Sequence, residues 1–366
     1  MKAWKRLLIA LLAVLMLCSL VACDDEPPAE EPAPDDGGTT PQAEEKAIDV
    51  YFIAGQSNAA GTTTIEDAAA LIADYPALST GTDPYIMYAG VSAALDDKAP
   101  ANHNWGSVKL GLGYNATHFG PEVGMAKELS AYYNAETGKQ AAIIKYTHGG
   151  TGLRNEWKPP SSRSENEAEG IGGLYDGLVN EAYKRLSELK EKGYNKINIK
   201  GLYWMQGCND TWVYSDNPLS YPALFANLVN DFRNDLKDIM RDLQGEYAGA
   251  HNIPFFIGTI SPTYRMGESS YKQGKTWTDN GQAMTTAQNR NNPFIEMQKK
   301  LAEDNRNCYI IDNGANQTGK YEVAANGTVT YTVIGRDVSH WGQADCYAVG
   351  RNVGKMLLEK CTDYQP

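Results

Sequence analysis

Short apolar runs alternate with amphipathic segments from Ile48 to the end of the chain. The runs have the length of buried strands, and the segments between them carry apolar residues at helical spacing. The predicted strands cover residues 48–55, 84–90, 141–150, 197–207, 254–261 and 308–312. The predicted helices cover residues 121–134, 172–193, 222–243, 294–305 and 344–361. Because this alternation never breaks and favours a mostly parallel sheet with helices on both faces, residues 47–366 are predicted to form one α/β domain.

The first 46 residues follow a different pattern. Basic residues precede an apolar run over residues 7–22, which is typical of a signal peptide. The run ends in Leu20-Val21-Ala22-Cys23, which resembles the lipobox of bacterial lipoproteins, so we expect removal of residues 1–22 and lipidation of Cys23. An ordinary signal peptide and an uncleaved anchor are the alternatives.

Residues 23–46 are acidic, rich in proline and free of aromatic side chains, so they are predicted to form a disordered linker. Extended at roughly 3 Å per residue, such a linker reaches on the order of 70 Å. We therefore expect a domain in the bacterial cell envelope, anchored to the membrane by lipid and facing outside the cytoplasm.

The composition of the chain argues against some classes of function and favours others. The formal net charge of −12 provides no basic face for nucleic acid, so no nucleic-acid partner is expected. With 42% apolar and 10% aromatic residues, the chain can bury a large core. The high count of 22 tyrosines and 7 tryptophans suits a surface that meets sugars.

The cysteine pattern allows disulfides without requiring them. Cys346 and Cys361 lie at the two ends of the last predicted helix, about 22 Å apart at a rise of about 1.5 Å per residue. Any disulfide would therefore pair one of them with Cys308 or Cys208. No histidine or cysteine spacing fits a metal site, so no metal and no cofactor are expected.

Residues that could carry out chemistry come directly after the predicted strands. Open parallel sheets place their functional residues at these carboxyl ends of the strands. Four segments stand there: Gly55-Gln56-Ser57-Asn58, His148-Gly149-Gly150-Thr151, Gln206-Gly207-Cys208-Asn209-Asp210 and, after a further loop, Asp337-Val338-Ser339-His340. Ser57, in a tight turn after a strand, fits an exposed nucleophile. Asp337 and His340 are three positions apart, which would place them on one face of a helical turn. A carboxylate there can orient an imidazole that accepts the proton of a serine.

Acyl transfer also needs hydrogen-bond donors for the developing oxyanion. The backbone N–H groups of Ser57 and Gly150 and the side-chain amide of Asn209 are candidates. Gln206 is an alternative to Asn209. Gly149 and Gly120 are alternatives to Gly150.

The four segments resemble the blocks of the SGNH/GDSL hydrolase superfamily. GQSN in place of the usual GDS, FGPE at residues 119–122, KYTHGGTGL at residues 145–153 followed by Trp157, and WMQG at residues 204–207 are similar to the sialic-acid-specific acetylesterase family, also called carbohydrate esterase family 6. The resemblance covers residues 48–361 and implies a flavodoxin-like three-layer α/β/α sandwich, the SGNH hydrolase fold.

The resemblance also implies residue roles. Ser57 would be the nucleophile, His340 the base and Asp337 the residue that orients it, and Ser57, Gly150 and Asn209 would form the oxyanion hole. The chain departs from the family where Cys208 and Asn209 replace the usual glutamate and serine.

We therefore expect a metal-independent serine esterase that removes O-acetyl groups from an acetylated glycan or sialic acid. It would resemble sialate O-acetylesterases or acetylxylan esterases. The residues expected to contact the substrate are Gln56, Gln206, Trp157 and Trp341. A hydrolase of non-sugar esters and a non-catalytic sugar-binding lipoprotein are the alternatives, and the choice of sugar and hydroxyl stays open.

Overall fold

The computed structural model describes residues 45–66, 68–94, 100–214 and 219–365. The predictions for residues 1–22 and for Cys23, and most of the predicted linker, lie outside the described residues. Glu45 and all that is described after it belong to one compact unit.

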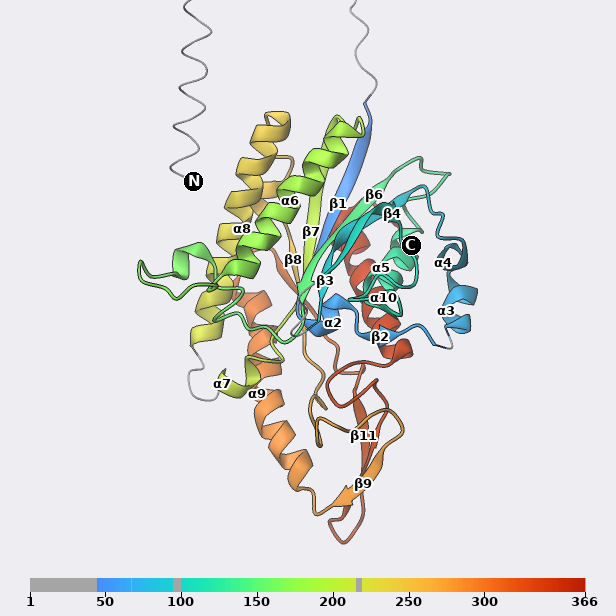
Figure 1. Cartoon of the computed structure of the whole chain (residues 1–366), viewed down its shortest axis with the longest axis vertical. Coiled ribbons are helices and arrows are strands. Elements are labelled where there is room, and N and C mark those ends of the chain that lie inside the picture. Colours follow the sequence, from blue (N-terminus) through green and yellow to red (C-terminus); the bar gives the residue numbers. More distant parts are fainter. Residues whose placement is uncertain (1–44, 67, 95–99, 215–218, 366) are drawn as a thin grey trace, which may run out of the picture. The chain divides into compact units, whose positions relative to one another are not determined.

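The domain is built on a seven-stranded sheet (Figure 1). Its strands lie in the order β10 (Cys308–Ile311), β8 (Phe255–Gly258), β7 (Lys196–Met205), β1 (Ala47–Gly55), β6 (Ala141–His148), β3 (Ile86–Ala93) and β4 (Ala101–Ser107). All neighbours pair in parallel except β3 and β4, which are antiparallel. The mostly parallel sheet predicted from the sequence is therefore confirmed.

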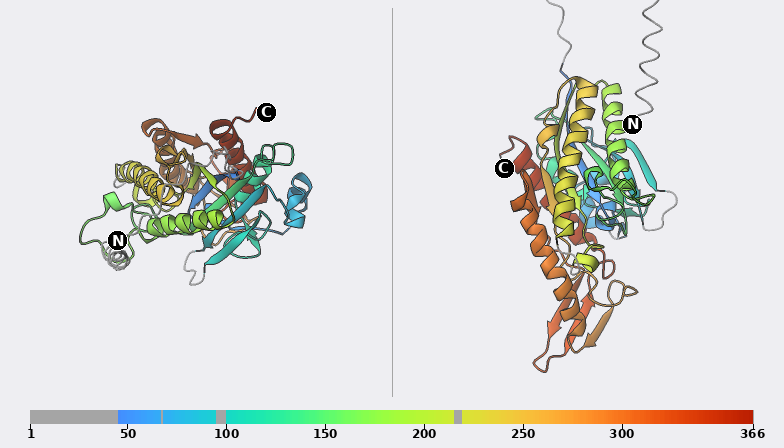
Figure 2. Two further views of the ribbon diagram at one scale, coloured as in Figure 1. Left: turned by 90° about the horizontal axis from the view of Figure 1, so that it is seen from above. Right: turned by 90° about the vertical axis from the view of Figure 1, so that its left-hand side faces the viewer.

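Helices cover both faces of this sheet and complete the predicted α/β/α arrangement (Figure 2). The long helices are α5 (Glu122–Leu129), α6 (Gly173–Glu191), α8 (Ser220–Gln244), α9 (Gln282–Asp304) and α10 (Gln343–Cys361). α5 packs against α10, α6 packs against α8, and α9 packs against β8 and β10. The apolar side chains of α8 recur at helical spacing and are buried. With helices on both faces, the middle of β1 is wholly inaccessible.

A second, smaller sheet projects beyond the main sheet. β9 (Thr276–Asp279) and β11 (Gly319–Val323) both pair antiparallel with β12 (Val329–Val333), and the rings of Trp277 and Tyr331 stack with centroids 4.7 Å apart. The remaining elements are α2 (Ser57–Ala60), β2 (Thr63–Thr64), α3 (Ala69–Asp74), α4 (Ala77–Thr80), β5 (His118–Phe119), η1 (Pro160–Ser162), α7 (Thr211–Tyr214) and η2 (Ala250–Asn252).

The structure adds elements that the sequence analysis lacked. β4, the small sheet and the first half of α9 were not predicted. α9 begins at Gln282 and not at residue 294 as predicted. The prediction missed its first turns because they are polar and because Pro293, which lies inside the helix, does not end it. Of the described helices, none is long and apolar enough to cross a membrane.

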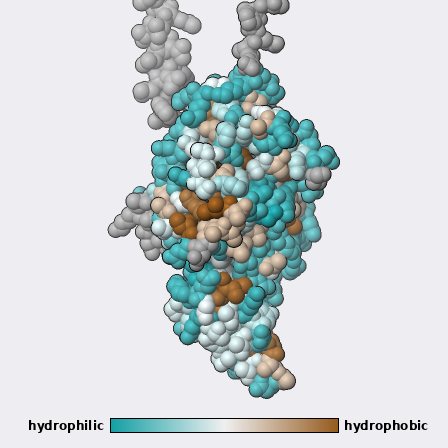
Figure 3. All heavy atoms as spheres, turned by 90° about the vertical axis from the view of Figure 1, so that its right-hand side faces the viewer, coloured by the Kyte–Doolittle hydropathy of each residue, from teal (hydrophilic) through white to brown (hydrophobic). Residues whose placement is uncertain are grey.

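The polar surface and the absence of disulfides among the four described cysteines both indicate that the internal core stabilises the domain. The face shown in Figure 3 is largely hydrophilic, with apolar side chains gathered in small patches. Cys208, Cys308, Cys346 and Cys361 are all free thiols, so the disulfides that the sequence permitted are not formed.

Candidate active site

A cavity of about 260 Å³ lies beyond the carboxyl ends of β1, β6 and β7. Residues from all four segments singled out in the sequence line it, including Gln56, Ser57, Gly150, Asn209 and His340. The parallel register of β1, β6 and β7 explains the convergence of the first three segments, because the three strands end on the same side of the sheet. The fourth segment follows β12 of the smaller sheet.

The turn that carries Ser57 is held against the end of β7. Gln56 donates its backbone N–H to the carbonyl of Met205 at 2.9 Å, and its side-chain Oε1 accepts the N–H of Gly207 at 3.1 Å. Gly55 has φ of +134°, and a Cβ there would lie 2.1 Å from the Met205 oxygen. Only glycine therefore lets β1 and β7 approach this closely, and the half-buried Ser57 follows as the first residue of α2.

Asp337 and His340 form a directly bonded pair. His340 Nδ1 lies 2.8 and 3.0 Å from the two carboxylate oxygens of Asp337. Asp337 Oδ1 also accepts the backbone N–H of Ser339 at 2.8 Å, and Arg336 contacts Oδ2 at 3.2 Å. The predicted pairing is present, but the helical turn is wrong: residues 337–340 form a tight turn closed by a bridge between Asp337 and His340.

The surroundings of Asp337 keep it ionised. Burial alone would raise the pKa of this carboxyl, but the hydrogen bond and charge of His340, the N–H of Ser339 and the charge of Arg336 together hold its pKa well below the usual range. An ionised carboxylate can only accept hydrogen bonds, so Nδ1 of His340 donates to it. Nε2 is then left as the imidazole nitrogen that can accept a proton.

Hydrogen bonds join the turn that carries Ser57 to the loop that carries His340. Asn58 Nδ2 donates to the carbonyl of Ser339 at 3.3 Å, and Asn58 Oδ1 accepts the N–H of Trp341 at 3.5 Å. Thr63 Oγ1 donates to the Trp341 carbonyl at 3.2 Å. The asparagine of GQSN thus fixes how the two halves of the site face each other.

Two backbone donors point to an oxyanion site. Within the described part of the chain, neither the N–H of Ser57 nor that of Gly150 finds a hydrogen-bond acceptor, although both residues line the cavity. Gly150 has φ of +72°, a conformation that favours glycine. Asn209 donates one side-chain hydrogen to the Gly150 carbonyl, which places its amide beside these donors. Such preorganised donors are what acyl transfer requires.

Gln206 occupies a different position from Asn209. Its side chain is fully buried and is not part of the cavity wall. Nε2 donates to Asp210 Oδ2 at 2.5 Å and to the Thr151 carbonyl at 3.0 Å, while Oε1 accepts the hydroxyl of Tyr221 at 2.8 Å. These bonds use its polar atoms, so the geometry favours Asn209 as the side-chain donor and gives Gln206 no contact with substrate.

The two tryptophans expected to contact sugar are core residues here. Trp157 and Trp341 are both completely buried, and neither lines the cavity. Trp157 packs edge-on against Trp204 and donates Nε1 to Thr151 Oγ1 at 2.8 Å. Trp341 donates Nε1 to the Asn316 carbonyl at 3.1 Å. Because no face of either ring is open, the expectation that they stack on a pyranose is corrected.

A buried ion pair supports the turn that carries Ser57. Lys145 Nζ lies 2.9 Å from Glu122 Oε2, and both side chains are fully inaccessible. The same ammonium donates to the carbonyls of Ala60, at the end of α2, and of Leu112. Glu122 also accepts the N–H of Gly120 at 2.8 Å. The FGPE and KYTHGG segments thus serve to position α2.

The sequence analysis missed several cavity residues. Thr62, Tyr114, Tyr264 and Arg265 lie outside the four segments, and Arg336 immediately precedes one of them. The only signal in the sequence for these residues was the arginine side chains themselves. Without the fold, the loop that carries Arg265 could not be placed at the cavity.

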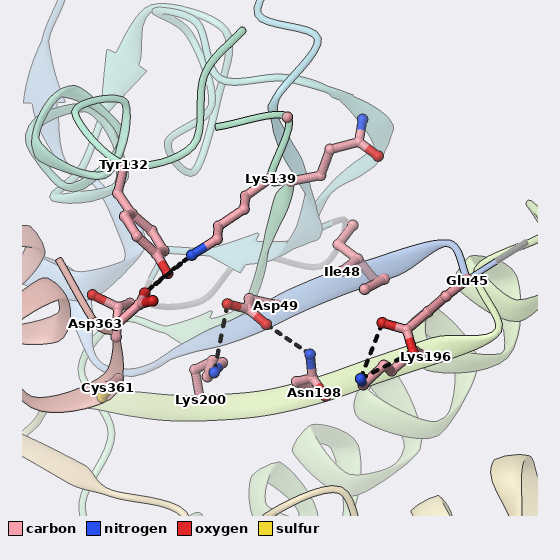
Figure 4. Close-up of a pocket in the computed structure, with 14 residues that line it drawn as sticks. Glu45, Ile48, Asp49, Tyr132, Lys139, Lys196, Asn198, Lys200, Cys361 and Asp363 are labelled. Atoms are coloured by element: carbon pink, nitrogen blue, oxygen red, sulfur yellow. Dashed lines mark hydrogen bonds and ion pairs between the residues drawn. The ribbon is translucent and has the colours of Figure 1, made fainter. Parts of the chain in front are cut away.

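A larger cavity, of about 670 Å³, lies at the opposite end of the strands, where β1 and β7 begin (Figure 4). Each of its three lysines already has a carboxylate partner. The pairs are Lys139 with Asp363 at 3.0 Å, Lys196 with Glu45 at 3.0 Å and Lys200 with Asp49 at 3.6 Å. Its charges are paired, and burial raises the pKa of the Cys361 thiol in its wall to about 12, so this cavity is a poorer candidate than the smaller one.

A comparison with models of protein families identifies the family of the chain. A model of the family described as carbohydrate esterase, sialic acid-specific acetylesterase matches residues 47–305. This range includes Ser57, Gly150 and Asn209 and ends before Asp337 and His340. A comparison with curated protein sequences found no significant match.

Several solved structures are similar to this chain. NanS shares 16% identity with a TM-score of 0.49, over 86% of this chain and 98% of that chain. XAC1771, a carbohydrate acetylesterase from Xanthomonas citri, shares 17% identity with a TM-score of 0.45, over 84% of this chain and 54% of that chain. A protein from Arabidopsis thaliana shares 14% identity with a TM-score of 0.46, over 86% of this chain and 98% of that chain. Because the family model matches most of its length, the chain is a carboxylic-ester hydrolase and belongs to the sialic acid-specific acetylesterase family of carbohydrate esterases.

Proposed function

We propose that this protein is a serine esterase that removes O-acetyl groups from carbohydrate through an acetyl-Ser57 intermediate. The observation that carries the proposal is that one cavity brings together Ser57, His340 with its partner Asp337, and two backbone N–H groups that find no acceptor among the described residues. A site that only bound sugar would need none of these groups.

In the first half-reaction, Ser57 Oγ attacks the acetyl carbonyl carbon while Nε2 of His340 takes the hydroxyl proton. Asp337 stabilises the imidazolium that forms. The N–H groups of Ser57 and Gly150, with the amide of Asn209, stabilise the oxyanion. His340 then returns the proton to the sugar oxygen as the bond between that oxygen and the acetyl carbon breaks, which leaves acetyl-Ser57.

In the second half-reaction, water replaces the sugar. His340 takes a proton from the water as the water oxygen attacks the acetyl carbon. The tetrahedral species then collapses: the bond between the acetyl carbon and Ser57 Oγ breaks, His340 returns the proton to Oγ, and acetic acid leaves and ionises to acetate. The small cavity volume suits an acetyl group, with the sugar outside at the rim.

The test is Ser57→Ala, with Ser79→Ala as the matched control because Ser79 is an exposed serine on α4. Acetate release from 4-nitrophenyl acetate and from acetylated sialate, xylan, pectin and peptidoglycan should fall about 10⁴-fold or more in Ser57→Ala and stay unchanged in the control. A fluorophosphonate should label the parent and fail to label His340→Ala. Near-parental turnover by a folded Ser57→Ala protein would exclude the serine mechanism.

The location of the enzyme is a further part of the proposal. The apolar run over residues 7–22 and the lipobox-like Leu20–Cys23 support cleavage before Cys23, lipidation of that residue and retention at the cell envelope, outside the cytoplasm. Acetylated envelope or extracellular glycans would then be within reach.

A further inference from the structure

Two tyrosines line the catalytic cavity, and their rings have different surroundings. Tyr264 is buried, and the Cζ atoms of Arg290 and Arg265 lie 5.6 and 5.9 Å from the centroid of its ring. Tyr114 is half-buried, so part of its side chain stays open at the wall of the cavity. Of the two rings, that of Tyr114 is therefore the one that a substrate can reach.

The loop that carries Tyr114 is fixed to the end of α2, the helix that begins with Ser57. The backbone N–H of Tyr114 donates to the carbonyl of Gly61, the residue that caps α2, at 3.2 Å. A Cβ at Gly113 would lie 2.3 Å from the same carbonyl oxygen, so only glycine lets the loop approach this closely. The N–H of Gly113 donates to the His118 carbonyl at 2.8 Å and closes the loop. These backbone contacts set the position of the Tyr114 ring relative to Ser57.

His118 packs against one side of the Tyr114 ring. The centroids of the two rings lie 4.5 Å apart, and their planes are tilted by 44°. The hydroxyl oxygen of Tyr114 lies 3.3 Å from His118 Nε2. Because His118 covers one side of the ring, the other face is the one available to a substrate in the cavity. An aromatic face of this kind packs well against the apolar C–H groups on one face of a sugar ring.

Hydrogen bonds around His118 determine which atom of this pair donates. Asn115 Oδ1 accepts the backbone N–H of Thr117 at 2.9 Å, and it lies 2.7 Å from His118 Nδ1. Nδ1 therefore carries the hydrogen, and Nε2 accepts the hydroxyl hydrogen of Tyr114. Burial, and then the positive charge of Arg336, lower the pKa of His118, so the imidazole is neutral near pH 7. The Tyr114 oxygen keeps lone pairs that can accept a hydrogen bond from a sugar hydroxyl.

We propose that Tyr114 packs against the sugar ring of the substrate while the acetyl group enters the cavity, and that His118 holds the tyrosine ring in place. This rests on the proposed esterase function. Tyr114 takes the role that the sequence analysis expected of Trp157 and Trp341, whose rings are buried in the core. Tyr114 is then a substrate-binding residue, and His118 is a positioning residue that acts through it. Hydrolysis of the acetyl ester itself needs neither side chain.

The experiment compares acetyl esters with and without a sugar ring. The probes are the monoacetyl esters of methyl xyloside, methyl glucoside and N-acetylneuraminic acid, beside 2-methoxyethyl acetate, which has no ring. Acetate release is the readout, and the parent should favour at least one sugar ester in kcat/KM. On that ester, Tyr114→Ala should lower kcat/KM about tenfold, the size of one aromatic contact, chiefly through KM. On 2-methoxyethyl acetate it should stay within about twofold of the parent, since the catalytic groups are intact.

Further variants separate contact with the sugar from a merely structural role. Tyr114→Phe keeps the ring and should keep most of the preference for the sugar ester. His118→Leu removes the acceptor of the Tyr114 hydroxyl and should raise KM for the sugar ester with little change in kcat. His118→Gln, whose side-chain oxygen can still accept that hydroxyl, should restore part of the loss. Tyr183→Ala removes an exposed tyrosine on α6 and should match the parent on every substrate.

The outcomes separate this inference from the proposed function. If the parent releases acetate through Ser57 but favours none of the sugar esters, the sugar contact at Tyr114 is wrong and the esterase function stands. The same conclusion follows if Tyr114→Ala keeps the preference or lowers kcat/KM equally on both kinds of ester. If Tyr114→Ala does not fold, an unchanged KM for the sugar ester in His118→Leu overturns the inference in its place. If the parent cleaves no acetyl ester, both proposals fall.

Discussion

Replacing Lys145 by methionine should destabilise the fold severely. The Lys145 ammonium uses all three of its hydrogens, on Glu122 Oε2 at 2.9 Å, the Leu112 carbonyl at 3.0 Å and the Ala60 carbonyl at 3.2 Å. Methionine fills similar space but leaves the Glu122 carboxylate charged in an inaccessible interior, with the N–H of Gly120 as its remaining donor. Removing one partner of a buried pair costs about 3–5 kcal/mol. We expect a loss in this range in the free energy of unfolding.

A second variant separates the cost of leaving the Glu122 charge unpaired from the cost of the lost packing. In Glu122→Gln/Lys145→Met the amide still accepts the N–H of Gly120, but no charge is left behind. This double variant should therefore be more stable than Lys145→Met by about 1 kcal/mol or more. Lys355→Met, on the exposed face of α10, is the control and should change stability by no more than about 0.5 kcal/mol.

The measurement is urea unfolding followed by tryptophan fluorescence and far-ultraviolet circular dichroism, with linear extrapolation to water. Two results would refute the reasoning. One is a loss below about 1 kcal/mol in Lys145→Met, which would mean that the Glu122 charge is solvated or neutralised. The other is a double variant that is less stable than Lys145→Met, which would mean that the unpaired Glu122 charge does not cause the loss in the free energy of unfolding.

Three further predictions concern the site and the N-terminus. Asp337→Asn should lose up to about 10⁴-fold in kcat/KM and His340→Ala at least as much, with the double variant scarcely worse than His340→Ala; losses that multiply would make Asp337 a structural loop residue. Because the fold lowers the pKa of Asp337, its ionised form stabilises the protein above the unfolded pKa of about 4, and this contribution is lost as the pH falls through the lower folded value. The difference in unfolding free energy between the parent and Asp337→Asn should therefore shrink below about pH 4, and a difference independent of pH would contradict it. Cys23→Ser should move the protein from the membrane to the soluble fraction without changing kcat/KM, and retention in the membrane after cleavage elsewhere would contradict the lipobox.

The sequence predicted the main sheet and the convergence of Ser57, Gly150 and Asn209, because both depend on patterns that are strong locally. His340 follows β12 of the small sheet, which was not predicted, so its place at the same cavity was an expectation from the resemblance alone. Alternating apolar runs and amphipathic segments predict a parallel sheet, and such a sheet brings the ends of its strands to one edge. The prediction was wrong for Trp157 and Trp341. Nearness to a catalytic segment in the chain does not determine which way a side chain points, and both rings point into the core.

The rest of the site depends on contacts between distant segments. Residues 101–107 alternate between partly buried and exposed positions, and the first turns of α9 are polar, so neither shows a strong apolar pattern. Arg265 reaches the cavity because its loop pairs with the loop that carries His340, through its N–H and the Val338 carbonyl. The choice between Gln206 and Asn209 likewise needed the hydrogen bonds of Gln206, which no spacing in the sequence reveals.

The direction of β1 has a practical consequence for handling the enzyme. The chain enters this strand at Ala47, and Ser57 follows closely on its last residue, Gly55. Nine residues at about 3.3 Å each separate the two ends by roughly 30 Å. Any attachment made through the N-terminal segment, such as a resin, a fusion partner or a lipid, therefore joins the domain at the edge of the sheet opposite the cavity. Immobilisation through the N-terminus should leave the cavity open to polymeric glycans, which suits the protein to use as a surface-bound deacetylation reagent.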